Sequence, residues 1–74
     1  MITKTEKKLL LKLGQNIRTY RIQNNLSQFQ LAIEAEIPRN QIGRIERAEI
    51  NTSIITLHKI ATVLKVDILM LLTL

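Results

Sequence analysis

The feature that most restricts the fold of this chain is a pair of short helical patterns between Ser27 and Arg47, joined by a very short break. Ser27 precedes Gln30 by three residues, which is the spacing of a capping box at the start of a helix. The apolar pattern stops at Glu36, and Pro38 follows it closely. Because proline has no backbone N–H and a fixed φ, it suits the entrance of a second helix rather than a helix interior. The segment therefore predicts a helix-turn-helix.

The second predicted helix, which we expect to start at Pro38, has two chemically different faces. Ile42 and Ile45 lie three residues apart and form an inward apolar stripe. The opposite face is polar, basic and nearly free of acid, and its members recur at helical spacing: Asn40, Gly43, Arg44 and Arg47. The whole chain carries a formal net charge of +5, which fits nucleic acid, anionic lipid or an acidic protein as partner. The placement of the basic residues has to decide among these partners.

A longer series of motifs extends from about residue 13 to residue 72. These motifs are Leu13-Gly14-x-x-Ile17-Arg18-x-x-Arg21, Leu26-Ser27-Gln28-x-x-Leu31-Ala32, Ile37, Ile42, Ile45-Glu46 and Leu57-x-x-Ile60-Ala61-x-x-Leu64-x-Val66. Each is weak alone, but together they are specific, and with them the chain resembles the phage repressor and Cro type (XRE-like) family of DNA-binding domains. The resemblance implies an all-α, lambda-repressor-like fold, a compact five-helix bundle with a helix-turn-helix. It also implies that the second helix of the motif enters the major groove while the first lies across the DNA backbone.

The resemblance places base contacts at the start and on the outer face of that second, recognition helix. Arginine can donate to guanine O6 and N7, and asparagine or glutamine can pair with adenine N6 and N7. The candidates are Arg39, Asn40, Gln41, Gly43 and Arg44. A glycine inside a helix costs about 1 kcal/mol relative to alanine. Gly43 is therefore explained either by close approach to DNA or as a tolerated neutral position.

Phosphate contacts and one ion pair also follow from the resemblance. Gln28 matches a family position whose side chain and neighbouring N–H groups hold a phosphate. Arg18 and Arg47 are weaker phosphate candidates, with ordinary solvated surface as the alternative. Arg21 and Glu46 match an arginine and a glutamate that form an ion pair, which fixes the angle of the recognition helix. The alternative for Arg21 is direct contact with DNA.

Three positions depart from the family pattern at turns. Glu36 and Ala48 stand where the family commonly has glycine, and Thr52 stands where proline is frequent. A non-glycine residue forced into the left-handed region costs roughly 1 kcal/mol. We expect these changes to loosen the domain and not to abolish the fold.

Residues 3–24 predict the first helix, whose N-terminal part forms a basic extension over residues 1–12. Thr3 and Glu6 have capping-box spacing. The basic side chains of the extension predict a solvated face, with a membrane-surface helix or phosphate contacts as alternatives: Lys4, Lys7, Lys8 and Lys12. The side chains of the three consecutive leucines at residues 9–11 cannot all lie on one face of a helix. Part of this run should therefore cover apolar surface elsewhere in the protein, and Phe29 and Ile33 are candidates for that surface.

The C-terminal third predicts two more helices, capped by Ser53 and Asp67. The last one is apolar all the way round, although a terminal helix of a small bundle can bury only one side. The surplus predicts a dimer interface formed by Met70, Leu71 and Leu74. A homodimer would place two recognition helices about 34 Å apart, on a palindromic operator. A different protein partner, or a chain cut from a longer protein, are the alternatives.

Length and composition limit the remaining function classes. The 74 residues predict one domain, residues 1–74, with a small core and little room for a catalytic cleft. There is no cysteine, and His58 stands alone, so we expect no metal site, no cofactor and no catalytic residues. No apolar run approaches the ~20 residues that span a bilayer, so we expect no membrane association and a cytoplasmic, nucleoid-associated protein.

Together these features predict a sequence-specific regulator of transcription that binds double-stranded DNA, most simply as a repressor that occupies a promoter. An antitoxin or a restriction-modification controller would share this chemistry. The alternative from another class is a protein-interaction module that keeps the fold and uses its apolar C-terminal surface. An enzyme is the weakest hypothesis.

Overall fold

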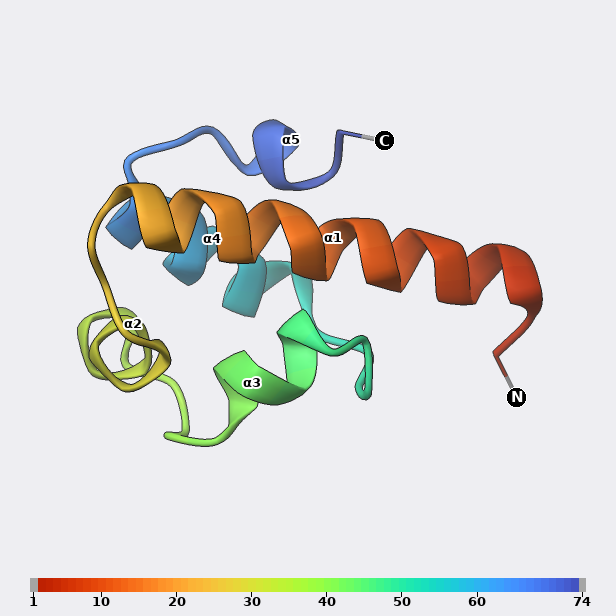
Figure 1. Cartoon of the computed structure of the whole chain (residues 1–74), viewed down its shortest axis with the longest axis horizontal. Helices are drawn as coiled ribbons and strands as arrows, with labels where there is room; N and C mark the ends of the chain where they lie inside the picture. Colours follow the sequence, from red (N-terminus) through yellow and green to blue (C-terminus); the bar gives the residue numbers. More distant parts are fainter. Residues whose placement is uncertain (1, 74) are drawn as a thin grey trace.

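Five helices connected by short turns make up residues 2–73, the part of the chain that the structure, a computed structural model, describes (Figure 1). They are α1 (Lys4–Gln23), α2 (Gln28–Ala35), α3 (Gln41–Glu46), α4 (Ile54–Leu64) and α5 (Ile68–Leu71). Within residues 2–73 there is no strand. The predicted all-α five-helix architecture is therefore confirmed, and α2 and α3 form the helix-turn-helix.

The helix starts follow from capping side chains that the sequence identifies. Thr3 Oγ1 accepts from the N–H of Glu6 at 3.1 Å, and the Glu6 carboxylate accepts from the N–H of Thr3, which completes a capping box. Ser27 and Gln30 form the same box at α2. The side chains of Ser53 and Asp67 cap α4 and α5. Each cap satisfies a backbone donor that has no partner inside its helix and contributes about 1 kcal/mol.

The recognition helix begins later than the sequence predicts. Pro38 and the two residues after it form a turn, in which the N–H of Gln41 donates to the Pro38 carbonyl at 3.0 Å. The helix α3 starts only at Gln41 and ends at Glu46. The start at Pro38 is thus wrong by three residues, because the fixed φ of proline suits a turn as well as a first helical residue.

Left-handed residues end four of the helices in the described part of the chain. Asn25, Glu36, Ala48 and Lys65 all have φ between 56° and 61°. After each of them an N–H reaches back to a carbonyl five residues earlier, as from Ile37 to Ala32 at 3.0 Å, which is the Schellman arrangement. The expected left-handed backbone at Glu36 and Ala48 is confirmed. The bonds satisfy helix carbonyls and offset part of the roughly 1 kcal/mol that each conformation costs.

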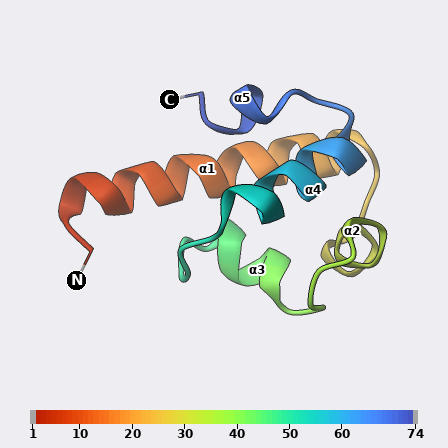
Figure 2. The same cartoon turned by 180° about the vertical axis from the view of Figure 1, so that it is seen from behind.

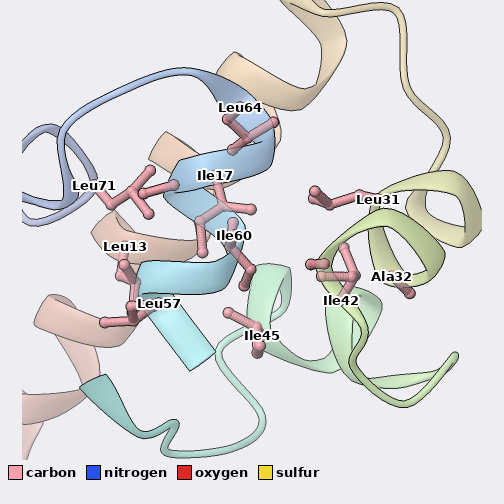
Figure 3. Close-up of a cluster of buried hydrophobic side chains, with 12 residues drawn as sticks. Leu13, Ile17, Leu31, Ala32, Ile42, Ile45, Leu57, Ile60, Leu64 and Leu71 are labelled. Carbon is pink, nitrogen blue, oxygen red and sulfur yellow. The ribbon is translucent and has the colours of Figure 1, made fainter. Parts of the chain in front are cut away.

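One apolar core joins the helices around α1 (Figure 3). Ile17 of α1 and Ile60 of α4 are fully buried, and Figure 3 shows side chains from α2 and α3 pointing toward them. The other buried members are Leu13, Leu31, Ala32, Ala35, Ile42, Ile45, Leu57, Ala61, Leu64 and Leu71. A fully buried Leu or Ile stabilises the fold by about 1.5–3 kcal/mol. The core therefore fixes the position of α3 against α1.

The first turns of α1 project beyond the rest of the bundle, as both views show (Figures 1 and 2). Leu9 and Leu11 in this part are exposed. Phe29 and Ile33 lie on α2, at the opposite end of α1, and are exposed as well. The expectation that the extension covers Phe29 and Ile33 is wrong, because α1 is one straight helix that carries its N-terminus away from α2. No helix within residues 2–73 is both long and apolar enough to span a bilayer.

Candidate nucleic-acid interface

Gly14 allows α1 and α3 to touch backbone to backbone. A Cβ placed on Gly14 would lie 2.5 Å from the carbonyl oxygen of Glu46 and 2.7 Å from that of Ile45. Cβ atoms do not approach other atoms so closely, and a helix backbone cannot give way as a flexible side chain can. Glycine is therefore required at this position for the observed distance between the two helices. The sequence pattern contains Gly14, but no role for it could be predicted from spacing.

A buried hydrogen-bond network holds the C-terminal end of α3. Arg21 Nε donates to Glu46 Oε2 at 2.7 Å and Arg21 Nη2 donates to Oε1 at 3.1 Å, so the expected ion pair is present and bidentate. Arg21 Nη1 donates to the carbonyl of Leu26 at 2.9 Å. Gln28 Nε2 donates to Glu46 Oε1 at 3.0 Å. Helices α1, α2 and α3 therefore meet at one carboxylate.

Arg21 is directed into the protein and not toward a ligand. It is only 8% exposed, and each nitrogen of its guanidinium group donates within the chain. Removing one partner of a buried, hydrogen-bonded ion pair leaves an uncompensated charge, which costs about 3–5 kcal/mol. The pair therefore acts as a positioning device for α3. The alternative of direct DNA contact by Arg21 does not fit this geometry.

Gly43 packs closely against side chains of its own chain. It is buried, and a Cβ on it would lie 2.9 Å from Arg47 Nη1 and 3.1 Å from Gln28 Oε1. The absent side chain makes room for two side chains of the protein itself. Both contacts are with the ends of flexible side chains, so they fit the explanation of Gly43 as a tolerated position and give no support to a contact with DNA.

The remaining base-contact candidates lie around the start and the outer face of α3. Arg39, Asn40 and Arg44 are exposed, and Gln41 is half-buried. The guanidinium carbon of Arg39 lies 4.7 Å from the centre of the Phe29 ring. A cation–π contact of this kind at an exposed site contributes about 0.5–1 kcal/mol. It ties Arg39 to α2 and gives Phe29 a contact that the sequence analysis missed.

Glu49 is an acidic residue beside this basic face that the sequence analysis also missed. Arg47 Nε donates to Glu49 Oε2 at 2.6 Å and Arg47 Nη2 donates to Oε1 at 3.3 Å. Arg44 Nε lies 3.9 Å from Glu49 Oε1. The hydrogen bond from Arg47 lowers the pKa of the Glu49 carboxyl, so the carboxylate is ionised at neutral pH. Spacing along a helix does not reveal this contact, because the left-handed turn at Ala48 produces it.

The basic extension of α1 also contacts the end of α3. Lys7 Nζ donates to the carbonyl oxygen of Ala48 at 2.6 Å. This ammonium group lies at the C-terminal end of α3, where the helix dipole favours positive charge. One of the four lysines of the extension thus forms a hydrogen bond within the chain. Arg18, farther along α1, is exposed.

The C-terminal helix differs from the predicted interface in one residue. Leu71 is fully buried in the core, and its carbonyl accepts from Asn16 Nδ2 at 3.0 Å. Leu71 is therefore withdrawn from the dimer interface, because its side chain packs inside its own chain. Met70 is exposed, and so is Leu69, which the sequence analysis did not include. The predicted contact by Leu74 lies outside the described residues.

No candidate metal site occurs in the described part of the chain. Holding a metal ion would take a group of at least three histidine, cysteine, aspartate or glutamate side chains, and residues 2–73 contain no such group. The polar side chains at the start and on the outer face of α3 are those of arginine, asparagine and glutamine, which supply hydrogen-bond donors. This donor set is suited to phosphates and to base edges.

Known proteins are similar to this chain in sequence and in fold. A family model described as helix-turn-helix (HTH_3) matches residues 17–71. The control protein C.SmaI of Serratia marcescens is 44% identical over 61 residues, which are 82% of this chain and 73% of that protein.

Two solved structures have the same fold. The restriction-modification controller protein C.AhdI from Aeromonas hydrophila superposes with a TM-score of 0.81 at 35% identity, covering 84% of this chain and 94% of that one. The hypothetical transcription factor NHTF from Neisseria gives a TM-score of 0.86 at 29% identity, covering 88% of this chain and 75% of that one. The chain therefore belongs to the helix-turn-helix family (HTH_3) of DNA-binding transcriptional regulators.

Proposed function

We propose that this regulator reads a specific sequence of double-stranded DNA with α3 in the major groove. The observation that carries the proposal is the rigid attachment of α3, through the backbone contact at Gly14 and the buried carboxylate of Glu46. A helix held in this way presents its outer side chains at reproducible positions, which direct readout requires. The base-contacting residues in this proposal are Arg39, Asn40, Gln41 and Arg44.

Contacts to the DNA backbone come from three residues in the same proposal. The side-chain amide of Gln28 donates one N–H to Glu46, which leaves its second N–H and the backbone N–H groups at the start of α2 to hold a phosphate. Arg18 and Arg47 are exposed and supply positive charge beside α2 and α3. Such contacts set the register of the protein on the duplex, whereas the contacts from α3 select the sequence.

The oligomer we propose is a homodimer with a two-fold axis near α5. Leu69 and Met70 are 68% and 42% exposed on this helix. Burying such side chains between two copies would remove apolar surface from water. A two-fold dimer would bind a palindromic operator with half-sites about one helical turn apart, roughly 34 Å.

The regulated genes we propose are those of a restriction-modification system. Two relatives support this: C.SmaI is a control protein, and C.AhdI is a restriction-modification controller protein. The simplest mode of action is repression by occupancy of a promoter, on DNA in the cytoplasm and without any catalytic step.

Selection of random duplex DNA by the purified protein tests this proposal. The selection is carried out at two salt concentrations, and the mass of the protein in solution is measured in parallel. We expect enrichment of a palindrome, binding that weakens steeply with salt, and the mass of a dimer. The enriched palindrome should lie upstream of restriction-modification genes. If nothing is enriched and only weak, salt-sensitive binding remains, the readout proposal is wrong and the protein-interaction alternative replaces it.

A further inference from the structure

The ion pair between Arg47 and Glu49 lies directly beside the surface that we propose for DNA. Both side chains are exposed, and two nitrogens of the Arg47 guanidinium donate to the two carboxylate oxygens. The third nitrogen, Nη1, lies over Gly43. The Arg47 guanidinium therefore lies between Glu49 and Gly43, and the side chain remains exposed to solvent.

The backbone that carries Glu49 is held in place from two sides. The N–H of Glu49 donates to the carbonyl of Arg44 at 2.8 Å, and Lys7 donates to the neighbouring carbonyl of Ala48 at 2.6 Å. The backbone of Glu49 is therefore held next to Arg47, the residue that directly follows α3. Less conformational freedom is lost when such a pair forms than when two mobile side chains meet.

A DNA phosphate and the Glu49 carboxylate offer Arg47 the same chemistry, two oxygens that accept parallel N–H bonds. We propose that Glu49 limits the affinity of this protein for DNA by competing with backbone phosphates for the guanidinium of Arg47. Arg44, 3.9 Å from the same carboxylate, is partly neutralised as well. This inference rests on the proposed DNA binding, and it adds an intramolecular competitor that no sequence pattern indicates.

The competition has a specific consequence for the salt dependence of binding. The number of phosphates that a protein neutralises sets the slope of log K against log salt, about −0.9 per phosphate for duplex DNA. In the wild-type chain Arg47 must leave a carboxylate before it can neutralise a phosphate. In the wild-type complex Arg47 is shared between Glu49 and the phosphate, whereas without that carboxylate Arg47 can make its proposed phosphate contact in full, which raises the number of neutralised phosphates by up to one.

The test compares Glu49→Gln with the wild-type chain and with Glu34→Gln as a matched control. Both substitutions remove one negative charge, but Glu34 lies beside α4, in a groove lined also by His58 and Lys59. Equilibrium binding to a random-sequence duplex is measured over a range of salt concentrations, and circular dichroism verifies the fold of each variant. We expect Glu49→Gln to bind roughly threefold to fivefold more tightly than Glu34→Gln, as the strength of an exposed ion pair implies. The salt slope should be steeper, by up to about one.

A double-mutant cycle shows whether Glu49 acts through Arg47. In an Arg47→Ala background, Glu49→Gln should lose most of its advantage over Glu34→Gln, and only the part that acts through the longer contact with Arg44 should remain. Equal affinities of the two glutamine variants in the wild-type background would overturn the inference. Weaker binding by Glu49→Gln would also overturn the inference, because it would show that Glu49 helps to orient Arg47 on DNA. Absence of DNA binding by the wild-type chain would overturn the proposed function itself, and the two failures are thereby distinguished.

Discussion

Gly14 of α1 lies so close to Glu46 of α3 that a Cβ on the glycine would stand 2.5 Å from the glutamate carbonyl oxygen. The side chain of the same glutamate accepts hydrogen bonds from Arg21 and Gln28. One residue at the end of the recognition helix is therefore fixed through both its backbone and its side chain. The position of α3, on which the proposed DNA readout depends, is set at this point.

Substitution of Gly14 by alanine should destabilise the domain. Alanine is favoured over glycine by about 1 kcal/mol in a helix interior, but here its Cβ would force two helix backbones apart, and the net loss should be about 1–2 kcal/mol. Gly43→Ala is the matched control, because its Cβ would meet only the ends of the flexible Arg47 and Gln28 side chains.

Urea denaturation of both variants measures these changes in the free energy of unfolding. The control should stay as stable as the wild-type chain or gain up to about 1 kcal/mol. A Gly14→Ala variant as stable as Gly43→Ala would show that α1 and α3 can separate without cost.

Loss of one partner of the Arg21–Glu46 pair should be strongly destabilising. Glu46→Leu leaves the Arg21 guanidinium buried without its carboxylate, so the free energy of unfolding should fall by about 3 kcal/mol or more. The double variant Arg21→Met/Glu46→Leu should recover much of this loss, since it removes both charges. Thermal unfolding reports the effect, at roughly 4–8 °C per kcal/mol for a domain of this size.

The exposed pair of Arg47 and Glu49 serves as the comparison for these substitutions in the buried Arg21–Glu46 pair. Glu49→Gln should change the free energy of unfolding far less than Glu46→Leu does, because the charge it leaves behind is hydrated. Equal losses from the buried and the exposed pair would contradict the assignment of Glu46 as the anchor of α3.

The helix caps could be predicted from the sequence, whereas the contacts between helices could not. The capping residues Ser27 and Ser53 were identified correctly, because a cap depends only on neighbours three residues away. The Arg21–Glu46 pair was expected only through the family resemblance. The role of Gly14 could not be predicted, because it depends on how closely two helices cross, and no local spacing records that distance.

The missed or corrected site residues have equally physical reasons. Glu49 reaches Arg47 only because Ala48 adopts a left-handed conformation, so helical periodicity places the two residues wrongly. Leu71 belongs to a helix that is apolar on every side, and such a pattern does not reveal which side faces the core. For Gly43 the sequence leaves two explanations open, close approach to DNA and a tolerated neutral position, and only the structure shows that the side chains of Gln28 and Arg47 lie against it.

Arg44→Ala should weaken binding to the selected DNA sequence and relax its preference at one base pair. A bidentate contact from arginine to guanine is worth about 1–3 kcal/mol of discrimination. Lys59→Ala is the control, because it removes one exposed positive charge from α4 and leaves α3 intact. Repeating the selection with each variant gives the measurement. An unchanged sequence preference of Arg44→Ala would remove Arg44 from the residues that set specificity.

Neighbouring residues of α5 should respond differently to substitution. Leu69→Glu should weaken self-association and leave the fold intact, since Leu69 is exposed. Leu71→Ala should lower the free energy of unfolding by about 2–5 kcal/mol, as for other buried leucines. Sedimentation equilibrium and urea denaturation separate the two effects. Ile33→Glu on α2 is a control of similar exposure, and if it disrupted self-association as much as Leu69→Glu, the interface would not be at α5.

The most direct test of the account is methylation interference on the selected duplex. Guanine N7 lies in the major groove and adenine N3 in the minor groove, so methyl groups at the two positions report which groove the protein occupies. With α3 in the major groove, methylation at guanine N7 should block binding in two half-sites about one helical turn apart. Interference confined to adenine N3, or interference at neither position, would contradict the central claim that α3 reads DNA.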